Sequence, residues 1–314
     1  MPDAVLEVVD GGLVTTVQGA GRPAMVTFGV PIGGACDRWS LALANALLGN
    51  NPTAPALEMA LLGPTLRVRA DCAVGLAGAD LSGRLDDGTE LRPGSARLLR
   101  AGQVLTFSSA TPGSGVRAYL ALAGGVDVPD VLGSPSTCLI GGFGGLEGRP
   151  LAAGDTISPR DPGGRRVGSW DGAAMPAAGP LRVVRGPHAS ELPDQALAGL
   201  LEGFFVVGRG DRQGIRLEGP SIKPGSLSLV SQPMRAGAVQ LPPDGRPIAL
   251  LVDHQTVGGY PVPAVVIGAD LPRLGQLGAG DGVRFREVGL GQARVALLGL
   301  EQELSLLGSR VAIA

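Results

Sequence analysis

The sequence predicts a mainly β protein with a few helices, organised as two related units. Three observations predict this. The 314 residues include 52 glycines and 26 prolines, which favours many turns and short strands over long helices. Short apolar runs between turn signals recur along both halves of the chain. Three short motifs occur twice in the same order, which indicates an internal duplication.

The composition restricts the class of protein. Hydrophobic residues make up 44% of the chain and aromatic residues only 3%, so the core must consist mostly of Val, Leu, Ile and Ala. The net charge of −2 implies no basic surface and argues against a nucleic-acid partner. The three cysteines are widely spaced, as reduced thiols in a cytoplasm would be, and no metal-ligand spacing is present. The sequence shows no signal-peptide pattern and no membrane-spanning stretch, so we expect a cytoplasmic protein away from membranes.

The first half is expected to begin with a hairpin, two strands within residues 4–18 joined at Gly11-Gly12. The clearest helix follows, with Asp37 as its cap, an apolar side and Gly49 at its end. Short strands then alternate with turns such as Asp86-Asp87-Gly88, which indicates an antiparallel barrel or sandwich. The expected strands are 57–62, 66–68, 73–77, 96–99, 104–107 and 116–122.

A glycine-rich loop follows at residues 124–145. It contains Ser136 and Thr137 but lacks the ending of a phosphate-binding P-loop. Its backbone N–H groups could bind an anion or an amide oxygen. The alternative is a loop that only closes the barrel.

Residues 158–180 are rich in Gly, Ala, Pro and Arg and show no periodicity, so they are interpreted as a linker. This places an N-terminal unit at 1–157 and a C-terminal unit at 181–314. In the second unit we expect a strand at 181–184, a helix at 193–202, and further strands between 204 and 285. A C-terminal helix is expected at 292–307, packed on the second unit.

The repeated motifs connect the two halves. Each half contains an Asp-Arg pair, then Gly-Ala-Asp-Leu, then a short turn that leads to a phenylalanine. Related units often form a site where they face each other, so we expect a polar site between them. The motif positions are 37–38, 78–81 and 101–107 in the first half, and 211–212, 268–271 and 279–285 in the second.

The most polar stretch of the second half is expected to carry the site. An apolar strand at 247–252 ends in Asp253, His254, Gln255 and Thr256. Gly258-Gly259 then allows a close backbone approach, and Tyr260 stiffens the exit together with Pro261. Such a strand end is typical of a binding site. The alternative is a polar hairpin tip.

Several side chains are candidates for chemistry. Arginine offers a planar fork that suits a carboxylate or a phosphate. His254 beside Asp253 could be a general base, although a lone histidine is more often structural. Asp37 is better interpreted as a helix cap. The sequence contains no Gly-x-Ser-x-Gly nucleophile motif.

Longer motifs carry a family resemblance, over about residues 5–288. The sequence resembles the allophanate hydrolase subunit 2 family, also called KipA-type proteins or C subunits of 5-oxoprolinase, which are similar to the carboxyltransferase domain of urea amidolyase. The motifs are residues 28–31, 36–50, 57–64, 78–81, 123–134, 211–217, 240–245, 253–261 and 269–274.

The resemblance implies a pair of cyclophilin-like β-barrel units and two partners, the A subunit of oxoprolinase and its KipI-like B subunit. Together such proteins open 5-oxoproline to glutamate with ATP hydrolysis, so this chain would be inactive without its partners. ATP would be bound with a partner protein, and no metal is implied. A lactam is a poor electrophile, so a chain of this family needs charge stabilisation more than a nucleophile.

The resemblance and the residue patterns together give the expected site. Catalytic roles are expected for Asp253, His254, Arg212 and Arg216. Substrate-binding roles are expected for Arg38, Asp80, Ser136, Thr137, Gln240, Gln255, Thr256, Gly258, Gly259 and Tyr260.

Some positions depart from the family pattern. Pro135 and Cys138 replace an arginine and an aromatic residue, Gln232 replaces a glutamate, and His254 replaces an arginine. Two other functions therefore stay open. One is a biotin-dependent carboxyltransferase component, with biotin on a partner because this chain has no Met-Lys-Met acceptor. The other is a non-enzymatic KipA-type regulator that binds a KipI-like protein.

Overall fold

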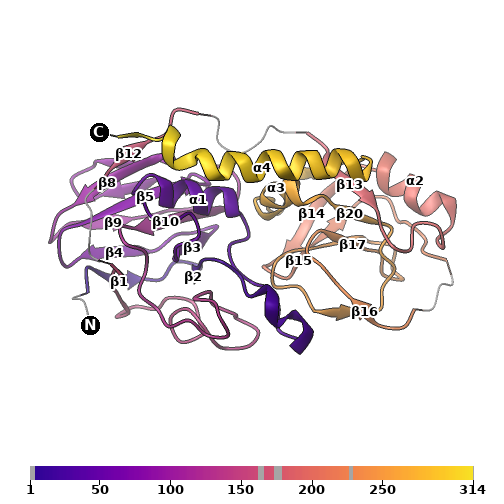
Figure 1. Cartoon of the computed structure of the whole chain (residues 1–314), viewed down its shortest axis with the longest axis horizontal. Coiled ribbons are helices and arrows are strands. Elements are labelled where there is room, and N and C mark those ends of the chain that lie inside the picture. The colour runs from indigo at the N-terminus through magenta and orange to yellow at the C-terminus, as the bar shows by residue number, and fades with distance from the viewer. Residues whose placement is uncertain (1–3, 162–165, 173–178, 226–228, 314) are drawn as a thin grey trace. The chain divides into compact units, whose positions relative to one another are not determined.

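The computed structural model describes residues 4–161, 166–172, 179–225 and 229–313 (Figure 1). The chain divides into two compact units. Unit 1 comprises residues 1–22, 33–175 and 303–314, and unit 2 comprises residues 23–32 and 176–302. Both units are mainly β, as predicted. Part of the predicted linker, residues 162–165 and 173–178, lies outside the described residues, whereas Gly168–Ser169 within it form a strand.

Unit 1 contains two antiparallel sheets. The first has the strand order β11-β1-β4-β9-β6-β7, and the second has the order β2-β3-β10-β5-β8-β12-β23. The strands of the first sheet are β1 (Leu6–Asp10), β4 (Thr65–Val68), β6 (Gly83–Leu85), β7 (Glu90–Leu91), β9 (Val104–Thr106) and β11 (Thr156–Ile157). Those of the second are β2 (Val14–Gln18), β3 (Ala56–Ala60), β5 (Cys72–Gly78), β8 (Ser95–Leu99), β10 (Arg117–Leu122), β12 (Gly168–Ser169) and β23 (Ala312–Ile313).

One core joins both sheets of unit 1. Leu66 and Leu105 from the first sheet and Leu57 and Leu76 from the second belong to the same buried cluster. All four are 1% exposed or less. The strands predicted between residues 57 and 122 are present within two residues of their expected bounds. The expected turn at Asp86-Asp87-Gly88 joins β6 to β7, and Gly88 has a positive φ of 85°.

The predicted N-terminal hairpin is wrong. Both strands exist, but β1 pairs with β4 and β11, whereas β2 pairs with β3 in the other sheet. Gly11 and Gly12 carry the chain from one sheet to the other. A Cβ at Gly11 would lie 2.1 Å from the carbonyl oxygen of Leu151, and one at Gly12 would lie 2.5 Å from that of Leu62. The glycines therefore allow a close backbone crossing instead of a tight turn.

Helix α1 (Arg38–Ala46) begins as predicted. Asp37 is its cap, and a carboxylate oxygen of Asp37 accepts the backbone N–H of Ser40 at 3.0 Å. Gly49, with φ of 73°, follows the end of the helix. The helix packs on β5 and β10, so its burial ties the loop before it to the second sheet.

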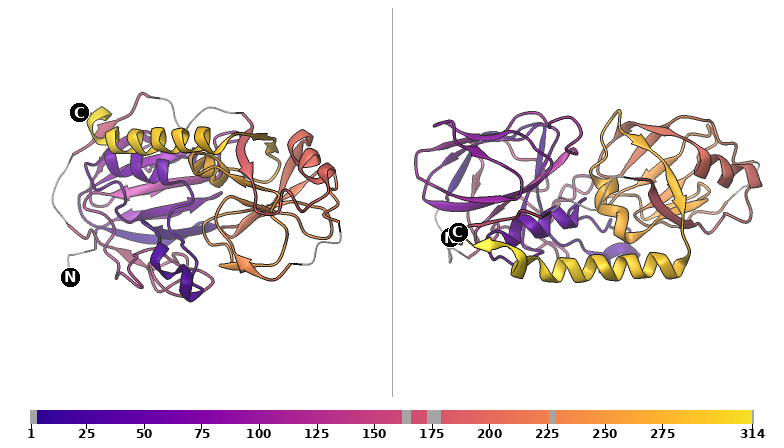
Figure 2. Two further views of the ribbon diagram at one scale, coloured as in Figure 1. Left: turned by 45° about the vertical axis from the view of Figure 1, so that its right-hand side comes forward. Right: turned by 90° about the horizontal axis from the view of Figure 1, so that it is seen from above.

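Unit 2 is built on one eight-stranded sheet of order β21-β14-β15-β18-β17-β20-β13-β22. Its end strands β21 and β22 are separated only by Arg284, so the sheet is nearly closed into a barrel (Figure 2). The strands are β13 (Leu181–Arg185), β14 (Phe205–Gly210), β15 (Gly214–Glu218), β17 (Ala238–Gln240), β18 (Ile248–Leu250), β20 (Ala264–Val266), β21 (Gly282–Val283) and β22 (Phe285–Glu287), with a separate pair β16 (Gln232–Pro233) and β19 (Val257–Gly258). Its core includes Phe205, Leu217 and Phe285.

Two of the remaining helical segments were predicted from the sequence. Helix α2 (Asp194–Glu202) begins after Pro193, as predicted. Helix α4 (Leu290–Arg310) covers the predicted C-terminal helix, and its residues up to Gln302 group with unit 2. The sequence did not predict the other segments, which are η1 (Pro23–Phe28), η2 (Gly268–Asp270) and α3 (Leu271–Gly275).

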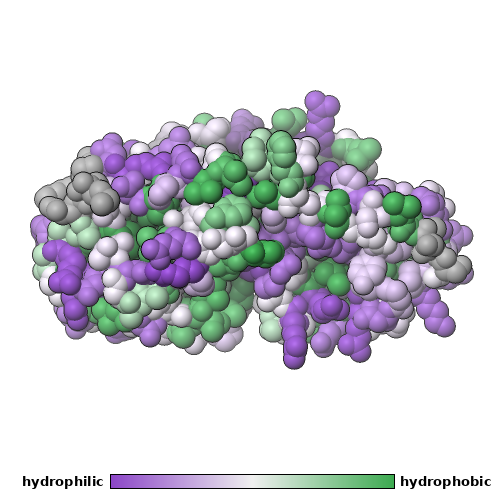
Figure 3. Space-filling view, turned by 90° about the horizontal axis from the view of Figure 1, so that it is seen from below, coloured by the Kyte–Doolittle hydropathy of each residue, from purple (hydrophilic) through white to green (hydrophobic). Residues whose placement is uncertain are grey.

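The surface mixes apolar and hydrophilic side chains on the face drawn in Figure 3. No helix within the described ranges combines the length and apolar character needed to cross a membrane.

Candidate functional site

Unit 2 contains a pocket of about 380 Å³ on the face of the sheet opposite its core. Strand alternation explains the placement. Ile215 and Leu217 of β15 point into the core, so Arg216 between them points to the other face. Arg216 pairs across the sheet with Ile248, which pairs with Gln240. The lining residues are Arg209, Gly210, Asp211, Gln213, Gly214, Arg216, Gln240, Ile248, Leu250, Gln255 and Tyr260.

The pocket carries an excess of positive charge. Arg209 and Arg216 are exposed, and neither forms an ion pair within the described ranges. The single acidic lining residue, Asp211, accepts the backbone N–H groups of Gln213 at 2.7 Å and Gly214 at 3.3 Å. Two available guanidinium groups beside an engaged carboxylate suit a small anionic ligand.

Amide side chains add polar groups to this pocket. Gln255 Nε2 donates to Oε1 of Gln240 at 3.1 Å, and Gln240 Nε2 donates to Sδ of Met234 at 3.5 Å. Tyr260 is 44% exposed and lines the same pocket. Thr256 does not line it, and its carbonyl oxygen accepts the N–H of Met234 at 2.8 Å.

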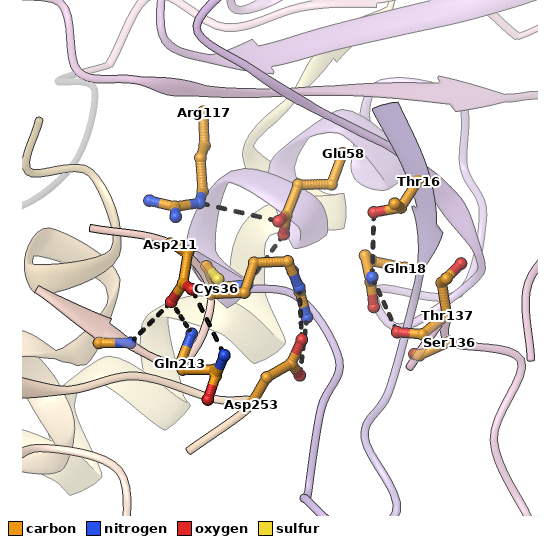
Figure 4. A network of polar contacts seen from close by, with 12 residues as sticks. Thr16, Gln18, Cys36, Glu58, Arg117, Ser136, Thr137, Asp211, Gln213 and Asp253 are labelled. Carbon is orange, nitrogen blue, oxygen red and sulfur yellow. Dashed lines mark hydrogen bonds and ion pairs between the residues drawn. The ribbon is translucent and has the colours of Figure 1, made fainter. Parts of the chain in front are cut away.

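Arg212 and Asp253 form a buried ion pair. Arg212 Nε lies 2.8 Å from Oδ2 of Asp253, and Nη2 lies 3.2 Å from Oδ1, so the pair is bidentate. The side chains are 8% and 3% exposed. Neither residue lines the pocket, so this pair holds the segment after β18 in place without reaching the pocket. Asp253 is among the residues labelled in Figure 4.

His254 is 1% exposed, and among the described residues its imidazole makes one hydrogen bond. Its Nδ1 lies 2.7 Å from the carbonyl oxygen of Gln255, so Nδ1 carries the proton that is donated. The other nitrogen, Nε2, is buried, and no hydrogen-bond partner for it is present among the described residues. Burial lowers the pKa of His254 below its ordinary value, opposed by the bond to Gln255 and by Asp253.

Gln232, a position that departs from the family pattern, contacts the second histidine. Nε2 of its side-chain amide lies 2.6 Å from Nε2 of His188. Nδ1 of His188 accepts the backbone N–H of Val262 at 2.9 Å, so Nε2 is the protonated nitrogen and needs an acceptor. The two ends of a glutamine amide have nearly the same shape, so turning the Gln232 amide over places its oxygen where it can accept this proton. Both residues then have a structural role.

In unit 1, Ser136 and Thr137 hold the glycine-rich loop to the end of β2 and to Gly19 directly after it (Figure 4). Ser136 Oγ accepts the N–H of Gly19 at 3.0 Å, and Thr137 Oγ1 donates to the carbonyl oxygen of Val17 at 3.0 Å. Gln18 Nε2 donates to the carbonyl oxygen of Thr137 at 3.2 Å. Both predicted residues are fully buried and serve this loop, which favours the interpretation as a barrel-closing loop.

The N–H groups of the same loop are largely engaged within it. Gly142 donates to Cys138, Gly145 to Pro135 and Cys138 to Phe143, each at 2.9 Å or less. Few of these amides are therefore left for an anion.

A buried network surrounds Glu58, and sequence reasoning missed it. Glu58 accepts the N–H of Cys36 at 2.9 Å, and Arg117 lies 3.8 Å away (Figure 4). Glu58 also accepts the hydroxyl of Tyr119 at 2.7 Å. The hydroxyl of Tyr119 accepts the N–H of Asp37 at 2.8 Å. Burial, followed by the Glu58 carboxylate, holds the pKa of Tyr119 well above its usual range. The one sequence signal was a glutamate inside an apolar run.

Two further predicted residues lie in unit 1. Arg38 is the first residue of α1 and is half-buried. Asp80 lines a second pocket, of about 350 Å³, with Ser82, Gly83, Arg84, Glu90, Leu91 and Arg92. Its Oδ1 accepts the N–H of Ser82 at 2.8 Å. That the functional site lies between the two units stays a prediction.

The structure thus brings Arg216, Gln240, Gln255 and Tyr260 into one pocket. Arg209 and Gln213 in that pocket were missed. The signal that could have found them is the Gly-Arg-Gly run directly before Asp211-Arg212. Within the described ranges, no group of three or more His, Cys, Asp or Glu residues could hold a metal ion.

Comparison with known proteins confirms the family resemblance. The family model described as "Carboxyltransferase domain, subdomain A and B" matches residues 28–287. The chain is 36% identical over 299 residues to the C subunit of 5-oxoprolinase from Escherichia coli (strain K12), covering 92% of this chain and 93% of that protein. It is 35% identical over 300 residues to the C subunit of 5-oxoprolinase from Haemophilus influenzae (strain ATCC 51907 / DSM 11121 / KW20 / Rd), with the same coverage of 92% and 93%.

A solved structure, the K. lactis urea amidolyase, matches with a TM-score of 0.86 at 28% identity, over 98% of this chain and 20% of that one. The chain therefore belongs to the carboxyltransferase domain, subdomain A and B family, as a homologue of the C subunit of 5-oxoprolinase.

Proposed function

We propose that the chain is the C subunit of an ATP-dependent 5-oxoprolinase, which opens the lactam of 5-oxoproline to glutamate together with the A and B subunits. The observation that carries this proposal is the similarity to the C subunit of 5-oxoprolinase along nearly the whole length of both chains. The name of that relative implies an enzyme of several subunits. The specific partners, a KipI-like B subunit and an A subunit, belong to the proposal.

The pocket of unit 2 fits the chemical demand of this reaction. ATP would enter as a substrate, bound with a partner protein, and phosphorylation of the lactam oxygen would make the ring carbon electrophilic. Arg209 and Arg216 would hold the substrate carboxylate, and Gln255 and Tyr260 would orient the ring. The buried Arg212–Asp253 pair and His254 would keep the strand end in position without touching the substrate.

The first test is glutamate release from 5-oxoproline and ATP, using this chain mixed with the A and B subunits. Each protein is also left out in turn. We expect release that disappears when this chain is omitted. Undiminished release without this chain would refute the assignment.

Two arginine substitutions separate binding from folding. Arg216→Ala should leave the free energy of unfolding within about 0.5 kcal/mol but raise the KM for 5-oxoproline roughly 10- to 100-fold, as the loss of a charged hydrogen bond predicts. Arg212→Ala leaves the buried Asp253 carboxylate unpaired and should cost about 3–5 kcal/mol of stability. Arg246→Ala, an exposed arginine outside the pocket, is the matched control. Equal KM values for R216A and R246A would contradict the pocket assignment.

A second candidate function is a biotin-dependent carboxyltransferase component. The family description and the match to urea amidolyase favour it. Biotin would then arrive on a partner. Carboxyl transfer from a carboxylated biotin-carrier protein to a small amide, in the presence of this chain alone, would support this candidate over the first. Stable binding of a KipI-like protein, with neither glutamate release nor carboxyl transfer, would instead support a regulator.

We further propose that both units are cyclophilin-like barrels that arose by duplication. The nearly closed sheet of unit 2 supports this, as does a glycine turn that has the same hydrogen bonds at Gly102 in unit 1 and at Gly280 in unit 2.

A further inference from the structure

Three side chains form a short hydrogen-bonded chain that ends at the pocket of unit 2. It runs from Sδ of Met234 through the amide of Gln240 to the amide of Gln255. Met234 and Gln240 are buried, at 6% and 1% exposure, whereas Gln255 is exposed and lines the pocket. A buried sulfur atom is thus linked to a polar group that a ligand can reach.

The sulfur of Met234 fixes the direction of this chain. The two ends of a glutamine amide have nearly the same shape, so only their partners decide which end faces which way. A thioether sulfur accepts hydrogen bonds and cannot donate one. The NH₂ group of Gln240 must therefore face Met234, and its oxygen must face Gln255. Gln255 meets that oxygen with its own NH₂ group, which turns Oε1 of Gln255 away from Gln240.

Oε1 of Gln255 is an available acceptor. Within the described ranges, no donor forms a hydrogen bond with it. The other polar groups of the pocket include the guanidinium groups of Arg209 and Arg216, which can only donate. A ligand that binds both the two guanidinium groups and Oε1 of Gln255 needs an anionic group for the arginines and an N–H group for Gln255.

Gly258 preserves the space for the amide pair. A Cβ at this position would lie 2.8 Å from Nε2 of Gln240, 3.1 Å from Cγ of Met234 and 3.3 Å from Nε2 of Gln255. The chain of hydrogen bonds therefore depends on a close backbone approach at the glycine turn.

We propose that Met234 sets the polarity of this pocket, so that Gln255 presents an acceptor oxygen to the N–H group of a small cyclic amide that also carries a carboxylate. Met234 is a positioning residue, since it acts through Gln240 and Gln255. The proposal rests on the proposed function in its choice of 5-oxoproline as the probe.

The experiment compares two ligands that differ in one group. The full chain is titrated by calorimetry with 5-oxoproline and with its lactone isostere, in which a ring oxygen replaces the N–H group. In the lactone, the ring oxygen faces Oε1 of Gln255, and two acceptors cannot form a hydrogen bond. Wild type should therefore bind the lactone at least about tenfold more weakly than the lactam. In Met234→Leu, which keeps the volume but removes the acceptor, this ratio should fall towards one.

Met59→Leu is the matched control, because Met59 is buried in the core of unit 1. It should keep the wild-type ratio. Equal binding of lactam and lactone by wild type, or an unchanged ratio in M234L, would overturn the proposal. Binding of neither compound would overturn the pocket itself. Glutamate release by the assembled complex tests the proposed function separately, so the two failures can be told apart.

Discussion

Arg212 and Arg216 lie four residues apart, yet Arg212 is buried and Arg216 is exposed. Arg212 is 7% exposed and holds Asp253 with two hydrogen bonds. Arg216 lies on the outer face of β15 and lines the pocket. The sequence suggests that both bind an anion, because it shows the residue type without its burial. Burial therefore distinguishes the paired guanidinium of Arg212 from the exposed guanidinium of Arg216, and only for Arg216 do we propose contact with a ligand.

His254 gives a pH-dependent prediction at the same scale. Burial lowers its pKa in the folded protein, whereas the unfolded chain titrates near the ordinary value of about 6.5. Below that pH the unfolded state binds the proton more readily than the folded state. Stability from this group is therefore fully present above about pH 6.5 and declines as the pH falls towards the lower folded value.

Urea unfolding at about pH 7.5 and 5.5 measures the effect. Wild type should lose more stability between these values than His254→Gln or His254→Asn, which have no titratable group at this position. If both variants keep the full wild-type difference, another group is responsible.

At the scale of elements, helix α1 depends on a glycine in the strand beneath it. A Cβ at Gly75 of β5 would lie 2.5 Å from the carbonyl oxygen of Ala44 and 3.3 Å from Cβ of Leu47. Gly75→Ala should therefore force the helix away from the sheet and cost about 1–3 kcal/mol of unfolding free energy. Urea denaturation of the purified variant measures this loss.

Gly299→Ala in helix α4 is the matched control. Nothing lies within 4 Å of a Cβ at Gly299, and alanine has the better helix propensity. This variant should gain roughly 0.5–1 kcal/mol. A similar loss from both substitutions would show that contact with α1 is not the cause.

The elements also show what the sequence could predict. Local signals identified α1, the six strands expected between residues 57 and 122, and the C-terminal helix, because caps, periodicity and turns act within a few residues. The pairing of β1 with β4 could not be read from a Gly-Gly turn, since the crossing depends on distant backbone at Leu62 and Leu151. Arg216 and Gln255 were predicted as site residues. The positioning role proposed for Met234 could not be predicted, because it depends on a side-chain contact with Gln240 that no sequence motif indicates.

At the scale of the whole chain, two of the three repeated motifs have different structures in the two units. Asp37-Arg38 begins a helix, whereas Asp211-Arg212 lies between two strands. Gly-Ala-Asp-Leu ends a strand in unit 1 and starts helical turns in unit 2. Only the third motif has the same geometry in both units, and there the hydrogen bonds agree in detail.

The shared geometry is a turn in which a glycine faces a neighbouring strand. Gly102 N donates to the carbonyl oxygen of Val68 at 2.9 Å, and Val68 N donates back to Gln103 at 2.9 Å. Gly280 and Asp281 make the same two bonds with Val207, at 2.8 and 2.9 Å. The φ values of the two glycines are 94° and 92°. The same glycine turn, with the same hydrogen bonds to a neighbouring strand, therefore occurs once in each unit.

This equivalence predicts matched responses to substitution. Nothing lies within 4 Å of a Cβ at either glycine, so the cost of alanine is the left-handed backbone alone. Gly102→Ala and Gly280→Ala should each lose about 1–2 kcal/mol of unfolding free energy, and asparagine at either position should lose less because it tolerates this conformation. The turns have no partner in common, so the double alanine variant should lose the sum within about 0.5 kcal/mol. Calorimetric unfolding of the four single variants and the double variant measures all of these losses. A large cost at one glycine with none at the other would mean that the two turns are alike in hydrogen bonding but not in strain, and it would remove the strongest support for the duplication.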